Sequence, residues 1–81
     1  MHYVYLLKSE TTGKAYVGFT KDLKQRFIEH NNSKNKSTKH GIPWDLVYYE
    51  AYKDESKARI REKKLKQYGN SLALLKIRIG L

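Results

Sequence analysis

The fold is decided by residues 3–19, which read YVYLLKSETTGKAYVGF. Residues 3–7 and 15–19 are rich in tyrosine, valine, leucine and phenylalanine, and a turn-rich stretch with a glycine separates them. Aromatic and β-branched residues favour strands, so two such segments around a short turn predict a β-hairpin. Gly18 interrupts the second segment, where a glycine costs stability. It indicates a bulge or the close approach of another backbone or a ligand.

Outward from the hairpin, apolar residues recur at helical spacing from Asp22 to about Asn31, with Thr20 or Asp22 as the expected N-cap. Residues 31–41 are polar and cationic and have no periodicity, which predicts a loop.

Residues 44–52 carry aromatic and β-branched side chains in partial alternation, which predicts a third strand. Asp54 or Ser56 is expected to cap a second helix. That helix is predicted to run to about Tyr68 and to be followed by Gly69 just past its end.

A final apolar helix is expected to start at Ser71 and to carry Leu72, Leu75 and Ile79. The predicted fold class is α+β in the order ββαβα with a C-terminal helix. In it, a small three-stranded antiparallel sheet is flanked by helices. Residues 1–81 are the size of one small domain, and we expect them to form a single one.

Composition limits the classes of function. The chain has no cysteine, so any bound metal depends on oxygen or imidazole ligands. Seventeen Lys and Arg against eight Asp and Glu give a formal net charge of +9, which favours nucleic acid as partner, although ribosomal and membrane-surface proteins can be equally basic. The apolar run at the N-terminus is too short to span a membrane, and a cytoplasmic location is expected by default.

Glu62 is the most informative residue of the second predicted helix. At 100° per residue it lies about 40° from Ala58, and Leu65 lies about 20° to the other side, so the carboxylate is on or beside the apolar face. A buried carboxylate needs a cation, a proton or a metal ion. The alternative is a Glu62 that reaches solvent or pairs with Lys66, four residues on.

Arg26 and His30 are four residues apart and project from one helix face. Arginine matches phosphate oxygens and histidine moves protons near neutral pH, so the pair suits phosphoryl chemistry; a solvated basic face is the alternative. On the hairpin, the hydroxyls of Tyr5 and Tyr16 could converge near one end of the sheet. Both could equally be ordinary strand tyrosines.

Several motifs in order resemble the GIY-YIG endonuclease family. They are Tyr3-Val4-Tyr5, Tyr16-Val17-Gly18, Leu23-x-x-Arg26-x-x-x-His30-Asn31, the segment 43–48 (PWDLVY) and the segment 58–66 (ARIREKKLK). The match covers roughly residues 2–68. It looks like the small stand-alone, UPF0213-like branch, and it is similar also to the N-terminal nuclease domain of the DNA-repair excinuclease.

The resemblance implies single-metal hydrolysis of DNA phosphodiester bonds with one Mg²⁺ or Mn²⁺ ion, and repair or recombination are the candidate pathways. Glu62 would bind the metal and Tyr5 would help to activate water. Arg26 would stabilise the phosphorane charge, Tyr16 would hold water or phosphate, and His30 would assist proton transfer at Tyr5. A tyrosine near pKa 10 is a poor base unless cations or a second base favour its phenolate.

Two positions depart from the family pattern: Tyr3 stands where the first glycine is expected, and both central isoleucines are valine. Many family members also use an asparagine after the metal-binding helix. Asn70 is a candidate for this auxiliary role, although it arrives several residues early.

The polar loop supplies candidate phosphate contacts, or else is simply a solvated loop. Its candidates are Lys34, Lys36, Lys39 and His40. The expected partner is DNA, with branched or nicked forms as candidates, and specificity is low or supplied by a protein partner. The chain is expected to be monomeric and not to associate with membranes. Two alternatives stay open, namely a catalytically inactive nucleic-acid-binding module on the same fold and an accessory ribosome or RNA protein.

Overall fold

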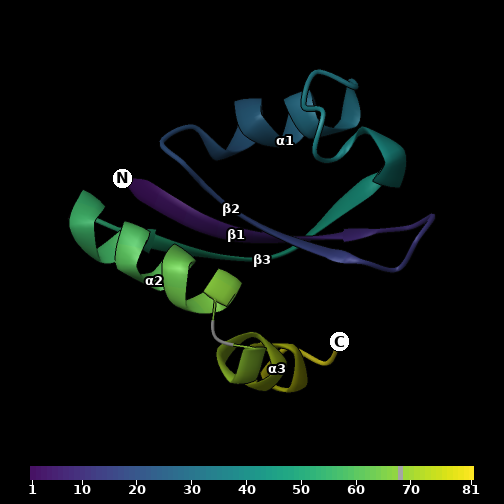
Figure 1. The fold of residues 1–81 in the computed structure, drawn as a ribbon. Helices are drawn as coiled ribbons and strands as arrows, with labels where there is room; N and C mark the ends of the chain where they lie inside the picture. Colours follow the sequence, from purple (N-terminus) through teal and green to yellow (C-terminus); the bar gives the residue numbers. More distant parts are fainter. Residues whose placement is uncertain (68) are drawn as a thin grey trace.

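The computed structural model describes residues 1–67 and 69–81, which form a three-stranded antiparallel sheet with helices on both faces (Figure 1). The strands are β1 (His2–Ser9), β2 (Ala15–Thr20) and β3 (Trp44–Tyr52), in the spatial order β2-β1-β3. The helices are α1 (Leu23–Asn31), α2 (Glu55–Gln67) and α3 (Gly69–Arg78), with a 3-10 turn, η1, at Lys39–Gly41. The predicted α+β class, the hairpin and the third strand are confirmed.

The central strand β1 is buried on both faces because side chains alternate along a strand. Val4 and Leu6 pack with Ala58, Leu65 and Leu75 under α2 and α3. On the other face, Tyr5 and Leu7 form a second cluster with Trp44, against which residues of α1 pack. Figure 1 shows α1 on one side of the sheet and α2 and α3 on the other.

Local polar contacts fix where α1 begins and ends. Asp22 is the N-cap, as predicted, and its carboxylate accepts a hydrogen bond from the Gln25 backbone N–H at 3.0 Å. Thr20 instead accepts from the Asp22 backbone N–H at 3.0 Å. At the other end, the Asn31 amide bonds both backbone groups of Trp44, at 3.1 and 2.7 Å, which ties α1 to the start of β3.

The second helix begins after Asp54, whose carboxylate accepts from the backbone N–H and the hydroxyl of Ser56, so Asp54 and not Ser56 has the capping role. The predicted end at Tyr68 lies outside the described residues. Gly69 lies just past the end of α2, as predicted, but it is also the first residue of α3. The last helix therefore starts two residues before the predicted Ser71.

The glycine that terminates a helix by a left-handed turn is Gly80, with φ +81°. The Leu81 backbone N–H bonds the Lys76 carbonyl at 2.8 Å, and the Gly80 N–H bonds the Ile77 carbonyl at 3.2 Å. This pair of bonds is the glycine-dependent C-terminal motif that the sequence predicts at Gly69. None of the helices in the described part of the chain is both long and apolar enough to cross a membrane.

Candidate active site

Tyr5 lies at the centre of the candidate site, on the α1 face of β1, and is only 3% exposed. Its Cα partner on the edge strand β2 is Gly18. A Cβ atom built on Gly18 would overlap the ring and hydroxyl of Tyr5, so the ring lies directly across this glycine. Of the two causes suggested for Gly18, close approach is correct, but the approaching group is a side chain of the same protein.

A methyl group at position 18 is therefore expected to displace Tyr5. We predict that Gly18→Ala lowers the unfolding free energy by about 1–3 kcal/mol, the usual cost of overpacking, and reduces any activity that depends on Tyr5. Urea unfolding measures the first effect. Gly69→Ala is the matched control, because nothing lies within 4 Å of the added methyl. Equal stabilities of the two variants would contradict this placement of Tyr5.

His30, at the C-terminal end of α1, is fully buried against Tyr5. Its Nε2 lies 2.8 Å from the Tyr5 hydroxyl and its Nδ1 lies 2.8 Å from Thr38 Oγ1. The Thr38 hydroxyl donates to the Asn35 carbonyl at 3.4 Å, so towards His30 it accepts. This assigns the ring proton to Nδ1 and leaves Nε2 to accept a proton from Tyr5.

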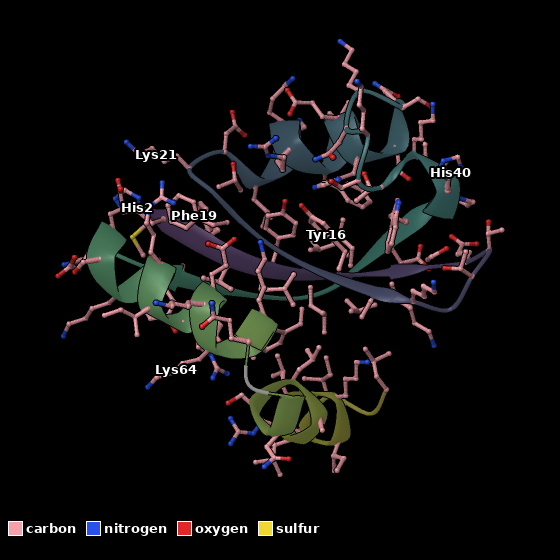
Figure 2. The ribbon with its side chains drawn as sticks, viewed as in Figure 1. His2, Tyr16, Phe19, Lys21, His40 and Lys64 are labelled. Carbon is pink, nitrogen blue, oxygen red and sulfur yellow. The ribbon has the colours of Figure 1, made fainter. Side chains whose placement is uncertain are left out.

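Tyr16 completes an aromatic cluster on the same face of the sheet. Its ring centroid lies 6.5 Å from that of Tyr5, 5.0 Å from that of His30 and 6.3 Å from that of Trp44. In Figure 2, Tyr16 lies on the side of the sheet that faces α1. The ring is half-buried, unlike Tyr5, so it forms the solvent-reachable side of the cluster.

Burial and the surrounding charges shift the pKa values of Tyr5 and His30. Burial raises the pKa of Tyr5; Tyr16 and Glu62 raise it further, and Arg26 lowers it. Burial, followed by the positive charge of Arg26, lowers the pKa of His30 below 6.5. Tyr5 therefore carries its proton in the resting protein, and His30 is a neutral base beside it.

Folding stability should therefore depend on the pH through His30. An unfolded histidine has a pKa near 6.5, so below this pH His30 of the unfolded chain binds a proton. In the folded chain His30 binds this proton only at a lower pH, below its own lowered pKa. The stability contributed by neutral His30 is complete above about pH 6.5 and is lost as the pH falls towards the folded-state pKa.

Urea unfolding of wild type, His30→Gln and His40→Gln at pH 7.5, 6.5 and 5.5 measures this dependence. His40 is exposed, so its variant should lose stability with falling pH as wild type does, whereas His30→Gln should lose less. The same slope in all three proteins would contradict the prediction.

Arg26 and Glu62 approach the cluster from opposite sides of the sheet. Arg26 comes from α1, and its side chain is 42% exposed, with Nη1 3.5 Å from Glu29 Oε1. Its positive charge lowers the pKa values of both Tyr5 and His30.

Glu62 lies on α2, which covers the opposite face of the sheet but packs against the edge strand β2 as well as β1. Its carboxylate is 18% exposed and lies 2.9 Å from Lys66 Nζ, so the pairing considered as an alternative is present. The same ammonium lies 5.9 Å from the centroid of the Tyr16 ring. Lys66 thus links Glu62 to Tyr16, and Glu62 contributes to the raised pKa of Tyr5.

Of the predicted residues, Tyr5, Tyr16 and His30 are in direct contact, while Arg26 and Glu62 act on them through space. The loop candidates Lys34, Lys36, Lys39 and His40 are exposed on the segment whose Thr38 holds His30. Asn70 is exposed in the first turn of α3. Among the described residues, no hydrogen bond joins it to the cluster.

Sequence reasoning missed Thr38 altogether and gave Lys66 no place in the site. The loop around Thr38 has no periodicity that would mark it as buried, although it is 1% exposed. Its burial comes from long-range contacts, including the bond from Trp44 Nε1 to its carbonyl at 2.7 Å. For Lys66, the spacing of four residues from Glu62 indicates an ion pair between the two side chains.

Comparison with known proteins gives consistent matches. The family model of the GIY-YIG catalytic domain matches residues 1–75. A UPF0213 protein of Staphylococcus epidermidis is 41% identical over 98% of this chain and 96% of its own, and one of Staphylococcus saprophyticus is 38% identical over the same shares. The solution NMR structure of a UPF0213 protein from Bacillus halodurans superposes with a TM-score of 0.60 and 29% identity. That match covers 98% of this chain and 86% of the other.

Proposed function

Because this chain belongs to the GIY-YIG family of nucleases, we propose that it is an endonuclease that hydrolyses DNA phosphodiester bonds with one divalent metal ion. The observation that supports this most is the hydrogen-bonded chain Tyr5–His30–Thr38 beside Arg26 and Glu62. It combines a proton acceptor, a cation and a carboxylate around Tyr5. These are the groups that hydrolysis of a phosphodiester requires.

The residues present fit a single hard cation that keeps most of its water. Within residues 1–67 and 69–81, no group of three or more His, Asp or Glu side chains could form an all-protein metal cage. Mg²⁺ and Mn²⁺ are commonly held by one or two carboxylates together with water and substrate phosphate. Glu62 would be the protein carboxylate of such a site. The Lys66 ammonium, 2.9 Å from Glu62 Oε2, already places one cation against this carboxylate.

In the proposed mechanism, Tyr5 receives a proton from the attacking water while its own proton passes to His30 Nε2. The raised pKa of Tyr5 means that the phenolate is not formed in advance, so this transfer to His30 makes the phenol effective as a base. Arg26 would face the charge that develops on the phosphorane, and Tyr16 would hold water or a phosphate oxygen. A divalent ion on Glu62 would polarise the phosphate and offset the leaving-group charge.

Around the site, the exposed loop residues Lys34, Lys36, Lys39 and His40 would contact phosphates without reading bases. A protein partner would then supply specificity. A role in repair or recombination, on branched or nicked DNA, and a monomeric state are parts of the same proposal.

Cleavage assays test this function directly. Purified protein is incubated with branched, nicked and linear DNA and with Mg²⁺, Mn²⁺ or EDTA. The expected result is metal-dependent cuts with 5′ or 3′ phosphate ends. Salt-sensitive binding without cleavage of any substrate would instead identify the protein as a non-catalytic binding module, and a preference for structured RNA would indicate an RNA-associated role.

Lys66 should compete with a metal ion for Glu62. Lys66→Met is expected to lower the Mn²⁺ concentration that half-saturates the DNA-free protein by about two- to fivefold, because an i,i+4 ion pair of helix residues contributes less than about 1 kcal/mol. Electron paramagnetic resonance of free Mn²⁺ measures this. Lys63→Met removes the same charge from an exposed position of α2 and is the control. Equal shifts in both variants would show a general charge effect and not competition at Glu62.

A further inference from the structure

A groove of about 580 Å³ lies on the α1 side of the sheet, between the start of α1 and strand β3. Its volume falls within the roughly 300–1,000 Å³ of small-molecule sites. Side chains from β1, β3 and α1 surround it. Lys21, which also lines it, lies at the turn that leads into α1 (Figure 2). The residues that matter here are Tyr3, Leu46, Tyr49, Phe27, Lys21 and Lys24.

Two tyrosines line the groove with aromatic surface. The rings of Tyr3 and Tyr49 meet edge to face, with centroids 6.0 Å apart. Tyr49 is 53% exposed, which is unusual for a large aromatic residue on a sheet face covered by a helix. An exposed tyrosine ring beside apolar walls is the kind of surface on which an unpaired nucleobase stacks.

The rim of the groove is cationic. Lys21 and Lys24 are both exposed, and the one ion pair found for Lys21 in the described structure is a long contact of 3.9 Å to Glu55. Asp22 also lines the groove, but its carboxylate is engaged as the N-cap of α1. The rim therefore suits the phosphates on either side of a base, in a chain with a net charge of +9.

The groove lies next to the candidate active site. Tyr3 and Tyr5 point to the same face of β1, and two residues along a strand span about 6.5–7 Å. Successive phosphates of one DNA strand advance about 3.4 Å along a duplex, so this spacing corresponds to about two nucleotides. A base in the groove would belong to a nucleotide within about two of a phosphate held at Tyr5 and Arg26.

We propose that this groove binds one unpaired nucleobase next to the cleaved phosphate, so that the substrate is DNA with unpaired nucleotides at the cut, such as a flap, a gap or a bulge. This rests on the proposed nuclease function and narrows its substrate class. A fully paired duplex does not fill the groove, because its bases are already stacked within the helix.

The test measures binding in EDTA, so that cleavage plays no part. Fluorescently labelled DNA is used in three forms, namely a duplex with a short flap, the same DNA with abasic flap nucleotides, and the full duplex. Tyr49→Ala is expected to weaken binding of the flap DNA about tenfold, within the range for one lost base stack. Tyr49→Phe should stay within about twofold of wild type, because the ring is kept.

Abasic flap nucleotides should weaken wild-type binding by the same factor, and Tyr49→Ala should then add no further loss. Ile60→Ala, which truncates a residue of α2 that is 55% exposed, is the control for removing surface area elsewhere. A Tyr49→Ala variant that binds all three DNAs as wild type does would overturn the proposal. That result would point to an apolar side chain of a protein as the occupant.

The two proposals fail in different ways. If the base-dependent preference is found but Mg²⁺ produces no cuts, the proposal for the groove is supported and the proposed nuclease function is wrong. If cuts appear with equal efficiency in flap and fully paired DNA, and Tyr49→Ala does not change them, the nuclease function stands and the groove proposal is wrong.

Discussion

Glu62→Gln is expected to abolish metal-dependent DNA cleavage, with a single-turnover rate constant at least about 10³-fold below wild type. The substitution keeps the size and the hydrogen-bonding capacity of the side chain but removes its negative charge. A metal ion contributes several kcal/mol of transition-state stabilisation, and each 1.36 kcal/mol corresponds to a tenfold change in rate. The loss should remain at high Mg²⁺ concentration if Glu62 is the protein ligand.

Glu55→Gln is the matched control. Glu55 lies on the same helix, and its ion pairs with Arg59 and Lys21 are exposed. Its variant should cleave within about twofold of wild type. Single-turnover cleavage with saturating protein measures both variants. A Glu62→Gln protein that is folded and cleaves at the wild-type rate would contradict the role given to Glu62.

The second large effect is expected for Tyr5→Phe, which removes one buried hydroxyl and keeps the ring across Gly18. Loss of the acceptor for the water proton should lower the cleavage rate by about 10²–10⁴-fold, the usual range for general acid–base catalysis. His30 Nε2 would also lose its partner. The thermal midpoint should therefore fall modestly, by an amount corresponding to about 1–3 kcal/mol for an unsatisfied buried acceptor.

Tyr52→Phe separates the catalytic effect from the structural one. The Tyr52 hydroxyl donates to Glu50 Oε1 at 2.5 Å, within a cluster that also holds Arg61. Burial, followed by this contact with Glu50, raises the pKa of Tyr52 to about 12, so it too is a protonated donor. Its variant should lose stability but keep its cleavage rate. Equal cleavage rates for Tyr5→Phe and wild type would show that the Tyr5 hydroxyl does not accept the proton of the attacking water.

The strands and helices could be predicted because their determinants are local. Alternation around Val4 and Leu6, the turn before Ala15 and the carboxylates of Asp22 and Asp54 specify elements within a few residues of themselves. Gly69 has its predicted position past α2, but the sequence did not indicate that it also begins α3. A glycine after a helical segment predicts a C-terminal turn, but which glycine takes the left-handed conformation depends on where the next helix starts.

The arrangement of the site could be predicted only in part, because it depends on long-range packing. The spacing of Arg26 and His30 placed them on one face of α1, and the position of Glu62 near the apolar face of α2 was correct. The pairing of Tyr5 with Gly18 follows from the strand register, which a single sequence does not specify. The burial of Thr38 under Trp44 requires the whole loop to fold back on β3.

The proposed nuclease function depends above all on a divalent ion held by Glu62 beside Tyr5 and Tyr16. The most direct measurement is the broadening of backbone amide NMR signals by substoichiometric Mn²⁺ in the DNA-free protein. Broadening is expected to be strongest at Glu62, Tyr16 and Gly18 and to disappear in Glu62→Gln. Broadening centred instead on the exposed carboxyl pair of Glu10 and Asp45, and unchanged in Glu62→Gln, would contradict it.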